Sequence, residues 1–278
     1  MSAFMNILSM LLSFLICFWY SLLGYPAAYD QPVRAIVGPV SESLRVMQGA
    51  GTDGYYVYVV IKDKSVEPDA VSSIVKYDPA SWSIVATYNN LQIEHGNDIT
   101  YNPLTDELII PDAKPDSTLL TVLDRNTMQI KRVITLTEKI YSIAYDASQD
   151  CYYAGVIGNK AFVQLDKDFN VMQSFPKQSS ANVTQGMELY KNYLCFIEYK
   201  TNCIQVYKKD GTFYGTFPLK ITENEPENIF VLGDTFYSGY YISKKGGGVF
   251  YELRFFSLPD DPVPVVPELP VEPLSEVA

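Results

Sequence analysis

A repeat of about 40 residues constrains the fold of this sequence more than any other feature. Short alternating apolar runs recur with turn residues between them, and no stretch sustains a helical period. A single four-stranded sheet cannot bury both of its faces, so successive units are expected to stack face to face around an axis. The sequence therefore predicts an all-β protein, a β-propeller of four-stranded blades over residues 32–257. The recurring units cover residues 54–88, 98–133, 141–175, 186–217 and 228–253.

The last unit decides how the ring is expected to close. It lacks an obvious fourth strand, whereas the segment Pro32–Val37 precedes the first unit and has the pattern of a lone strand. Pairing this segment with the last unit would complete that sheet and cover an exposed edge. We therefore expect five blades closed by an N-terminal strand. Six blades would need one more unit, and the sequence offers none.

Composition supports a sheet-rich core and argues against one class of partner. The chain contains 22 Tyr and 14 Phe, which favour pleated, half-buried surfaces. Its net charge is −11, and its basic residues form no stripe of the kind that nucleic-acid binders carry. We therefore expect no nucleic-acid partner.

Both ends of the chain are expected to lie outside the propeller. Residues 7–23 are almost continuously apolar and lead into Pro26-Ala27-Ala28, which is typical of an export signal cleaved near Ala28. Residues 1–28 are alternatively a retained membrane anchor, because the apolar run is near the lower limit for crossing a bilayer. In both cases the body is predicted to be secreted or at the cell surface, touching a membrane only through an uncleaved N-terminal helix. Residues 258–278, rich in Pro and Glu, are predicted to be an acidic disordered tail.

Two short motifs resemble known propeller families. The segment His95–Asn102 (HGNDITYN), followed by Glu107–Ile110 (ELII), resembles the inner strands of secreted propellers of the gluconolactonase and NHL-repeat type. The segment Val183–Met187 (VTQGM) resembles the opening motif of five-bladed glutamine cyclotransferases. Proteins of the gluconolactonase and paraoxonase type hold a metal with axial carboxylates and amides, so the first resemblance implies that a metal can bind on the axis.

Polar residues of the inner strands are expected to converge on one mouth of the central channel. Aligning the units places Gly49, Gly96 and Gly186 at one level. The residues around these glycines, together with the corresponding residue of the fifth unit, should face a ligand. The predicted ligand-binding residues are Gln48, His95, Asn97, Gln185 and Glu225.

A second level of this alignment suggests a metal site. Two positions further along, Asp98, Ser142, Glu188 and Asn228 coincide. Carboxylate and amide oxygens suit a hard cation such as Ca²⁺, so the candidate metal ligands are Asp98, Glu188 and Asn228. The alternative is a hydrated polar lining that holds no ion, because the strand starts meet water there.

His95 is the single histidine of the sequence and the candidate catalytic base. With Asp98 three residues on, it could deprotonate a water or a hydroxyl group at the channel mouth. The alternative is a hydrogen-bonded turn residue beside Gly96 and Asn97.

These features favour a propeller that binds a ligand at its channel mouth, whether a small molecule, a carbohydrate or a protein. The alternative function is a metal-dependent (Ca²⁺) hydrolase or lactonase that uses the same channel, with His95 or Glu188 as the base.

The cysteines are expected to be small core residues. Three of them, Cys151, Cys195 and Cys203, follow the apolar leader. A bridge between Cys195 and Cys203 would need the intervening hairpin to centre on Tyr199, because side chains alternate between the faces of a sheet. Asn182–Thr184 matches the acceptor pattern for N-glycosylation.

Overall fold

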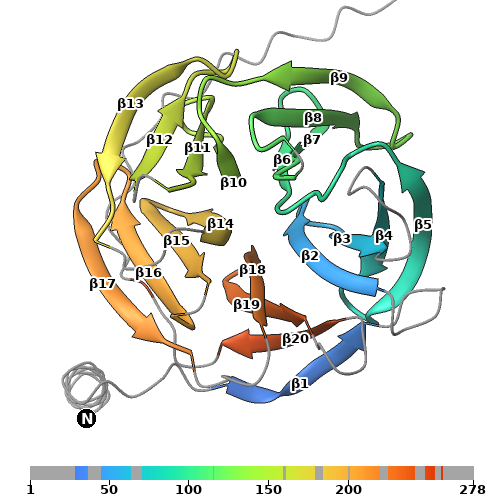
Figure 1. Ribbon diagram of the computed structural model, residues 1–278. Coiled ribbons are helices and arrows are strands. Elements are labelled where there is room, and N and C mark those ends of the chain that lie inside the picture. The colour runs from blue at the N-terminus through green and yellow to red at the C-terminus, as the bar shows by residue number, and fades with distance from the viewer. Residues whose placement is uncertain are drawn as a thin grey trace, which may run out of the picture.

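Figure 1 shows a computed structural model of the protein, in which five four-stranded sheets surround one axis. The structure describes residues 29–36, 45–63, 71–114, 116–158, 161–178, 184–199, 201–219, 225–241, 248–253 and 258. These described residues form strands and the turns between them, and include no helix long and apolar enough to span a membrane. The predicted five-bladed, all-β propeller is confirmed. The predicted signal or anchor (1–28), residues 259–278 of the tail and residues 182–183 of the acceptor pattern lie outside the described residues.

Within each blade the four strands are arranged from the axis outward, in the order in which they pair. The innermost strands are β2 (Arg45–Thr52), β6 (Thr100–Asn102), β10 (Ile140–Asp146), β14 (Thr184–Tyr190) and β18 (Glu225–Leu232). The second strands are β3 (Val57–Asp63), β7 (Glu107–Pro111), β11 (Cys151–Val156), β15 (Tyr193–Glu198) and β19 (Thr235–Tyr241). The third strands are β4 (Ser72–Asp78), β8 (Leu119–Asp124), β12 (Ala161–Leu165), β16 (Cys203–Lys208) and β20 (Gly248–Leu253). The outermost strands are β5 (Ser83–Leu91), β9 (Ile130–Thr135), β13 (Val171–Pro176), β17 (Phe213–Pro218) and β1 (Tyr29–Ile36).

The ring closes through its N-terminal strand, as the sequence predicts. β1 pairs antiparallel with β20, from Tyr29 opposite Leu253 to Ile36 opposite Gly248, and so completes the sheet of β18–β20. Packing reinforces this closure, because Trp82 of the first blade lies 5.6 and 5.5 Å from the rings of Tyr237 and Phe250 in the last blade. Aromatic pairs at such separations add stability beyond the area they bury.

The core consists of five apolar clusters, each shared by two neighbouring blades. Strand β3 shows how one sequence serves two interfaces. Its residues Val57, Val59 and Ile61 pack against the last blade, while Tyr58 and Val60 pack against the second. Successive side chains of a strand point to opposite faces of its sheet. The second strand of each blade is packed on both faces, so it needs apolar residues at nearly all positions. This requirement explains the continuous apolar runs of the repeat.

The inner strands approach one another so closely that some positions admit only glycine. A Cβ atom on Gly49 would lie 2.4 Å from Cα of Asp98, and one on Gly186 would lie 2.7 Å from Cα of Asn228. Both distances are far below van der Waals contact. Because the obstructing atoms belong to the backbone, they cannot move aside as a flexible side chain would.

The three cysteines among the described residues, Cys151, Cys195 and Cys203, are unpaired and buried, as expected of core residues. In the β15–β16 hairpin, Cys203 lies opposite Glu198, whereas Cys195 lies opposite Val206. The register therefore separates Cys195 from Cys203 along the hairpin.

The close approach of the inner strands leads to a first prediction. Replacing Gly49 with Ala should destabilise the protein by about 1–3 kcal/mol or more, because the added methyl group must displace the backbone of Asp98. Gly215→Ala is the matched control, since its Cβ would meet only the ring of Phe217, at 3.3 Å. Urea denaturation of the two variants checks this expectation. Equal midpoints would show that the inner strands have room to spread.

Candidate functional site

β-bulges in the inner strands fix which residues share a level of the channel. The pairing shifts by one residue at Tyr141 in β10, at Gln185 in β14 and at Glu227 in β18, and β2 has a similar irregularity at Gln48–Gly49. A bulge leaves its extra residue out of the ladder and re-aims the side chains around it. The residues that follow the bulges therefore share one level, namely Gly49, Ser142, Gly186 and Asn228.

The second blade joins this level through Asp98. The N–H of Asn97 donates to the carbonyl of Pro111 at 3.0 Å, and Thr100 pairs with Ile109, so Asp98 corresponds to Ser142 of the next blade. Glu188 lies two residues beyond Gly186 and is therefore level with Thr100 rather than with Asp98. The alignment expected from the sequence is wrong at this point.

The misalignment has a physical cause, because glycine serves two purposes in these strands. Gly96 has a φ of 56° and turns the chain into the inner strand. Gly49 and Gly186 instead allow the backbones of two blades to approach. If the three glycines are treated as equivalent, the second blade is misaligned by two residues. Glu188 is then wrongly placed level with Asp98.

Asn97 and Asp98 connect three blades across the axis. The side-chain amide of Asn97 donates to the carbonyls of Tyr141 and Gln185, at 3.0 and 2.7 Å. The carboxyl group of Asp98 accepts hydrogen bonds from the backbone N–H groups of Ile99, Ile143 and Met187, at 3.0–3.1 Å. Both side chains are buried, so these bonds satisfy backbone groups on the channel-facing edge of the inner strands, where no further strand pairs with them.

Asn228 plays the same part between the last blade and the first. Its side-chain nitrogen donates to the carbonyl of Gln48 at 2.6 Å. Its Oδ1 atom is buried and has no hydrogen-bond partner among the described residues.

The predicted metal ligands do not form a cation site. The oxygens of Asp98 face the positive ends of three N–H groups, and Glu188 lies at another level. A hard cation of the Ca²⁺ type needs six to eight oxygens around it. No group of three or more His, Cys, Asp or Glu side chains among the described residues could hold a metal ion. We therefore derive no chemistry through a metal.

Three of the predicted ligand-binding residues lie near the N-terminal ends of the inner strands. Gln185 donates from Nε2 to Glu225 and to Glu227, at 3.1 Å in each case. The amide of Gln48 donates to the carbonyl of its neighbour Met47 at 3.0 Å. We call this end of the channel the N-terminal mouth. Asn97 lies deeper, and both hydrogens of its amide are already used.

His95 precedes the inner strand of the second blade, and its backbone N–H donates to the carbonyl of Lys114 at 3.2 Å. Burial, together with the charges of Lys62 and Lys114, lowers the pKa of His95 to about 3. An efficient general base has a pKa near the working pH. His95 is therefore neutral at pH 7 but only weakly basic.

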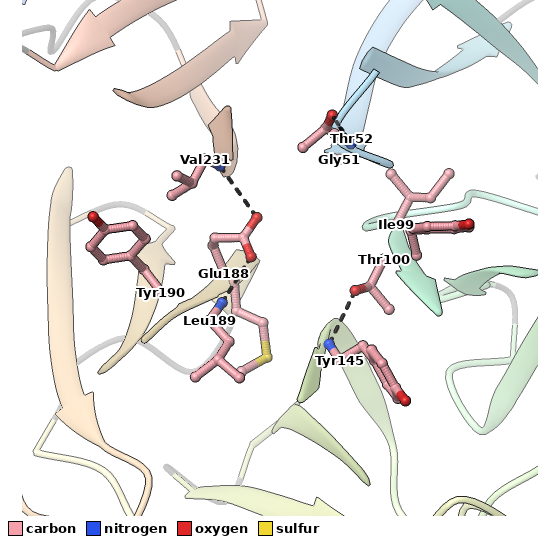
Figure 2. A pocket seen from close by; sticks show the side chains of 12 residues that line it. Gly51, Thr52, Ile99, Thr100, Tyr145, Glu188, Leu189, Tyr190 and Val231 are labelled. Atoms are coloured by element: carbon pink, nitrogen blue, oxygen red, sulfur yellow. Dashed lines mark hydrogen bonds between the residues drawn. The ribbon is translucent and has the colours of Figure 1, made fainter. Parts of the chain in front are cut away.

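A cavity of about 280 Å³ lies at the opposite end of the channel, which we call the C-terminal mouth. Every blade contributes to its lining, and Glu188 points into it from β14 while Thr52 and Thr100 face it from β2 and from the start of β6 (Figure 2). The lining residues are Gly51, Thr52, Gly54, Ile99, Thr100, Tyr101, Tyr145, Met187, Glu188, Leu189, Tyr190 and Val231.

Glu188 is the one lining residue with an ionisable group other than a phenol. Its carboxyl oxygens accept hydrogen bonds from the N–H of Leu189 at 3.0 Å and from the N–H of Val231 in the next blade at 3.4 Å. Part of the side chain is accessible from the cavity, yet desolvation by its surroundings raises the pKa of Glu188 to about 8. At neutral pH this carboxyl group is mostly protonated and both donates and accepts hydrogen bonds.

Tyrosine–aspartate pairs surround this mouth. Tyr101 donates its phenol hydrogen to Asp106 at 2.9 Å, and Tyr145 donates to Asp150 at 2.8 Å. These residues, and Thr52 and Thr100, were not among the candidates predicted from the sequence. The signal was present as a Tyr-x₄-Asp spacing repeated at 101–106 and 145–150.

No family model matches this sequence, and no curated protein matches it. Among solved structures, a chain of a nidogen/laminin complex is similar, with 14% identity and a TM-score of 0.52 over 76% of this chain and 77% of that one. A protein of unknown function from Bacteroides caccae is similar at 12% identity and a TM-score of 0.51, over 70% and 74% of the two chains. A streptogramin B lyase structure matches at 12% identity and a TM-score of 0.48, over 78% and 72%.

At such low identity, the first two likenesses show the fold alone. They agree with the β-propeller that the repeat predicts, and with the propeller fold implied by the resemblance of His95–Asn102 to known inner strands. The resemblance to glutamine cyclotransferases stays a prediction.

The bonds across the axis lead to a second prediction. Asn97→Ala should destabilise the protein by about 1–3 kcal/mol, because it removes the amide that bonds to the carbonyls of Tyr141 and Gln185. Asn126→Ala is the control, because that amide donates to Asp106 from an exposed position. Thermal or urea unfolding measures the difference. If both variants were equally stable, Asn97 would not be joining the blades.

The raised pKa of Glu188 predicts a pH dependence of stability. Its carboxyl group titrates at about 8 in the folded protein, against an ordinary value of 4.5, so the folded state holds the proton more tightly. This contribution is complete below pH 4.5 and is lost as the pH rises to about 8. Relative to Glu188→Gln, the natural protein should therefore lose on the order of a few kcal/mol over that range. The assignment would be contradicted if the free energies of unfolding of the two proteins changed with pH in the same way from pH 4 to 9.

Proposed function

We propose that this protein is an extracytoplasmic propeller that binds a small ligand in the cavity at its C-terminal mouth. The observation that supports this proposal is the cavity itself, in which all five blades surround one carboxyl group. Ligand sites are typically concave, with a few polar groups placed among apolar and aromatic ones. A volume of about 280 Å³ lies near the lower end of the range for such sites, so it suits a small molecule.

The lining favours binding over catalysis. Carboxylate-based hydrolysis of glycosides uses a pair of acidic side chains, and covalent catalysis uses a nucleophile with an adjacent base. Glu188 is the single carboxyl group among the described lining residues, which also include no His, Cys, Ser or Lys. His95 precedes the inner strand of its blade, whereas the cavity lies where the inner strands end. No observation therefore favours the metal-dependent hydrolase or lactonase.

The proposed location rests on the sequence. The apolar run of residues 7–23, which lies outside the described residues, is typical of a segment that directs export. The proposed ligand would then be met outside the cytoplasm.

A methyl NMR experiment tests the binding proposal. The full chain, labelled at Met, Ile, Leu and Val methyl groups, is titrated with a library of small polar molecules. We expect hits to shift the methyl signals of Met187, Leu189 and Val231, which line the cavity. Val231→Phe should abolish these shifts by filling the space, whereas Val133→Phe on the exposed side of β9 should not. Hits that shift only methyl groups elsewhere would overturn the proposal.

A further inference from the structure

The charge distribution around the cavity constrains the chemistry of its ligand. We infer that the cavity at the C-terminal mouth binds a small organic cation, an ammonium-type group held by the carboxyl group of Glu188. This inference rests on the binding function proposed above and names the class of ligand.

Glu188 lacks an oppositely charged partner among the described residues that line the cavity. A buried carboxylate needs an opposite charge or a full set of hydrogen-bond donors. Glu188 receives two backbone N–H groups, of which the one from Val231 is long at 3.4 Å. The described lining residues include no Lys, Arg or His. An ammonium group in the cavity would supply the charge that the protein does not.

Aspartate side chains gather around the C-terminal mouth. The phenols of Tyr101, Tyr145 and Tyr190 each donate to an aspartate, namely Asp106, Asp150 and Asp234. Arg125, one of the cations near this mouth, is paired with Asp53 at 3.1 Å and with Asp106. Carboxylates around a concave site focus the field and raise the local concentration of cations. An anionic ligand would meet repulsion here with no lining cation to offset it.

Cationic side chains of the protein already lie on two tyrosine rings of this mouth. The guanidinium group of Arg125 lies 5.7 Å from the ring centroid of Tyr101, and the ammonium group of Lys191 lies 4.7 Å from that of Tyr190. Aromatic faces attract cations within about 6 Å. The tyrosine rings at this mouth therefore accept cations on their faces.

Binding of a cation should be coupled to loss of a proton. The other titratable groups around Glu188 are Asp98 toward β6, Cys195 opposite it on β15, and Tyr101, Tyr145 and Tyr190 in the lining. Desolvation raises the pKa of every one of these groups. Glu188, with a pKa of about 8, is the carboxyl group that a bound cation would contact and convert to carboxylate. Cation affinity should therefore rise with pH up to about 8 and then level off.

The experiment compares cations with neutral molecules of the same shape. The full chain is titrated with choline and with 3,3-dimethyl-1-butanol, and with butylammonium and 1-butanol, while the methyl signals of Met187, Leu189 and Val231 are followed. We expect each cation to bind at least tenfold more tightly than its neutral partner at pH 8. Calorimetry in buffers of different ionisation enthalpy should detect proton release at pH 7.

Two variants separate the role of charge from that of the fold. Glu188→Gln should abolish the preference for the cation and the proton release, whereas Glu138→Gln, in the turn before β10, should change neither. The Glu188→Gln protein is first checked for a natural-like methyl spectrum. Should it fail to fold, the pH dependence of choline binding to the natural protein decides the question, because affinity that is flat from pH 6 to 8 overturns the inference.

The outcomes distinguish this inference from the proposed function. Neutral molecules that shift the cavity methyl signals as strongly as the cations would overturn the inference and leave the binding site intact. If neither the cations, their neutral partners nor any library molecule shifts those signals, both fail.

Discussion

The close packing of five inner strands around one axis is the constraint on which the rest of this structure depends. The backbones lie so close together that Gly49 and Gly186 have no room for a Cβ atom, and the channel-facing edge of each inner strand has no neighbouring strand to pair with. Buried backbone groups must find partners. Asn97 and Asp98 provide those partners for the third and fourth blades, and Asn228 provides one for the first. The polar residues on the axis thus replace ladder hydrogen bonds that the geometry of a small ring cannot form.

This constraint changes the interpretation of the most distinctive motif. The segment His95–Asp98 has the residue types of a catalytic or metal site, yet its chemistry is used inside the fold. Asn97 and Asp98 bond to the backbone of neighbouring blades, and His95 is held neutral by burial and two lysine charges. The cavity lies at the C-terminal mouth, where Glu188 accepts one long hydrogen bond from the next blade and faces open space. A motif rich in functional residue types can therefore mark the strongest structural demand of a fold.

The repeat, the turns and the closing strand were predictable because they follow from local patterns. Strand β1 matches the expected lone strand at Pro32–Val37, and the apolar second strands match the interfaces they serve. The levels of the channel were not predictable, because a bulge adds one residue without a mark in the hydrophobic pattern. Gly96 and Gly186 look alike in the sequence, although one is needed for its positive φ and the other for a close approach. An error of two residues was enough to group Glu188 with Asp98.

The contrast between these two carboxyl groups shows how a structural acid differs from one available to a ligand. A carboxylate offers about four lone-pair positions. Asp98 is completely buried, and three backbone N–H groups from three blades occupy its oxygens at 3.0–3.1 Å. Glu188 receives two, one of them at 3.4 Å, and its remaining side faces a cavity. Desolvation raises the pKa of both groups, but only Glu188 has space beside it in which a ligand can offset that cost. Unused acceptor capacity next to empty volume, rather than burial or charge alone, is what makes Glu188 the candidate for recognition.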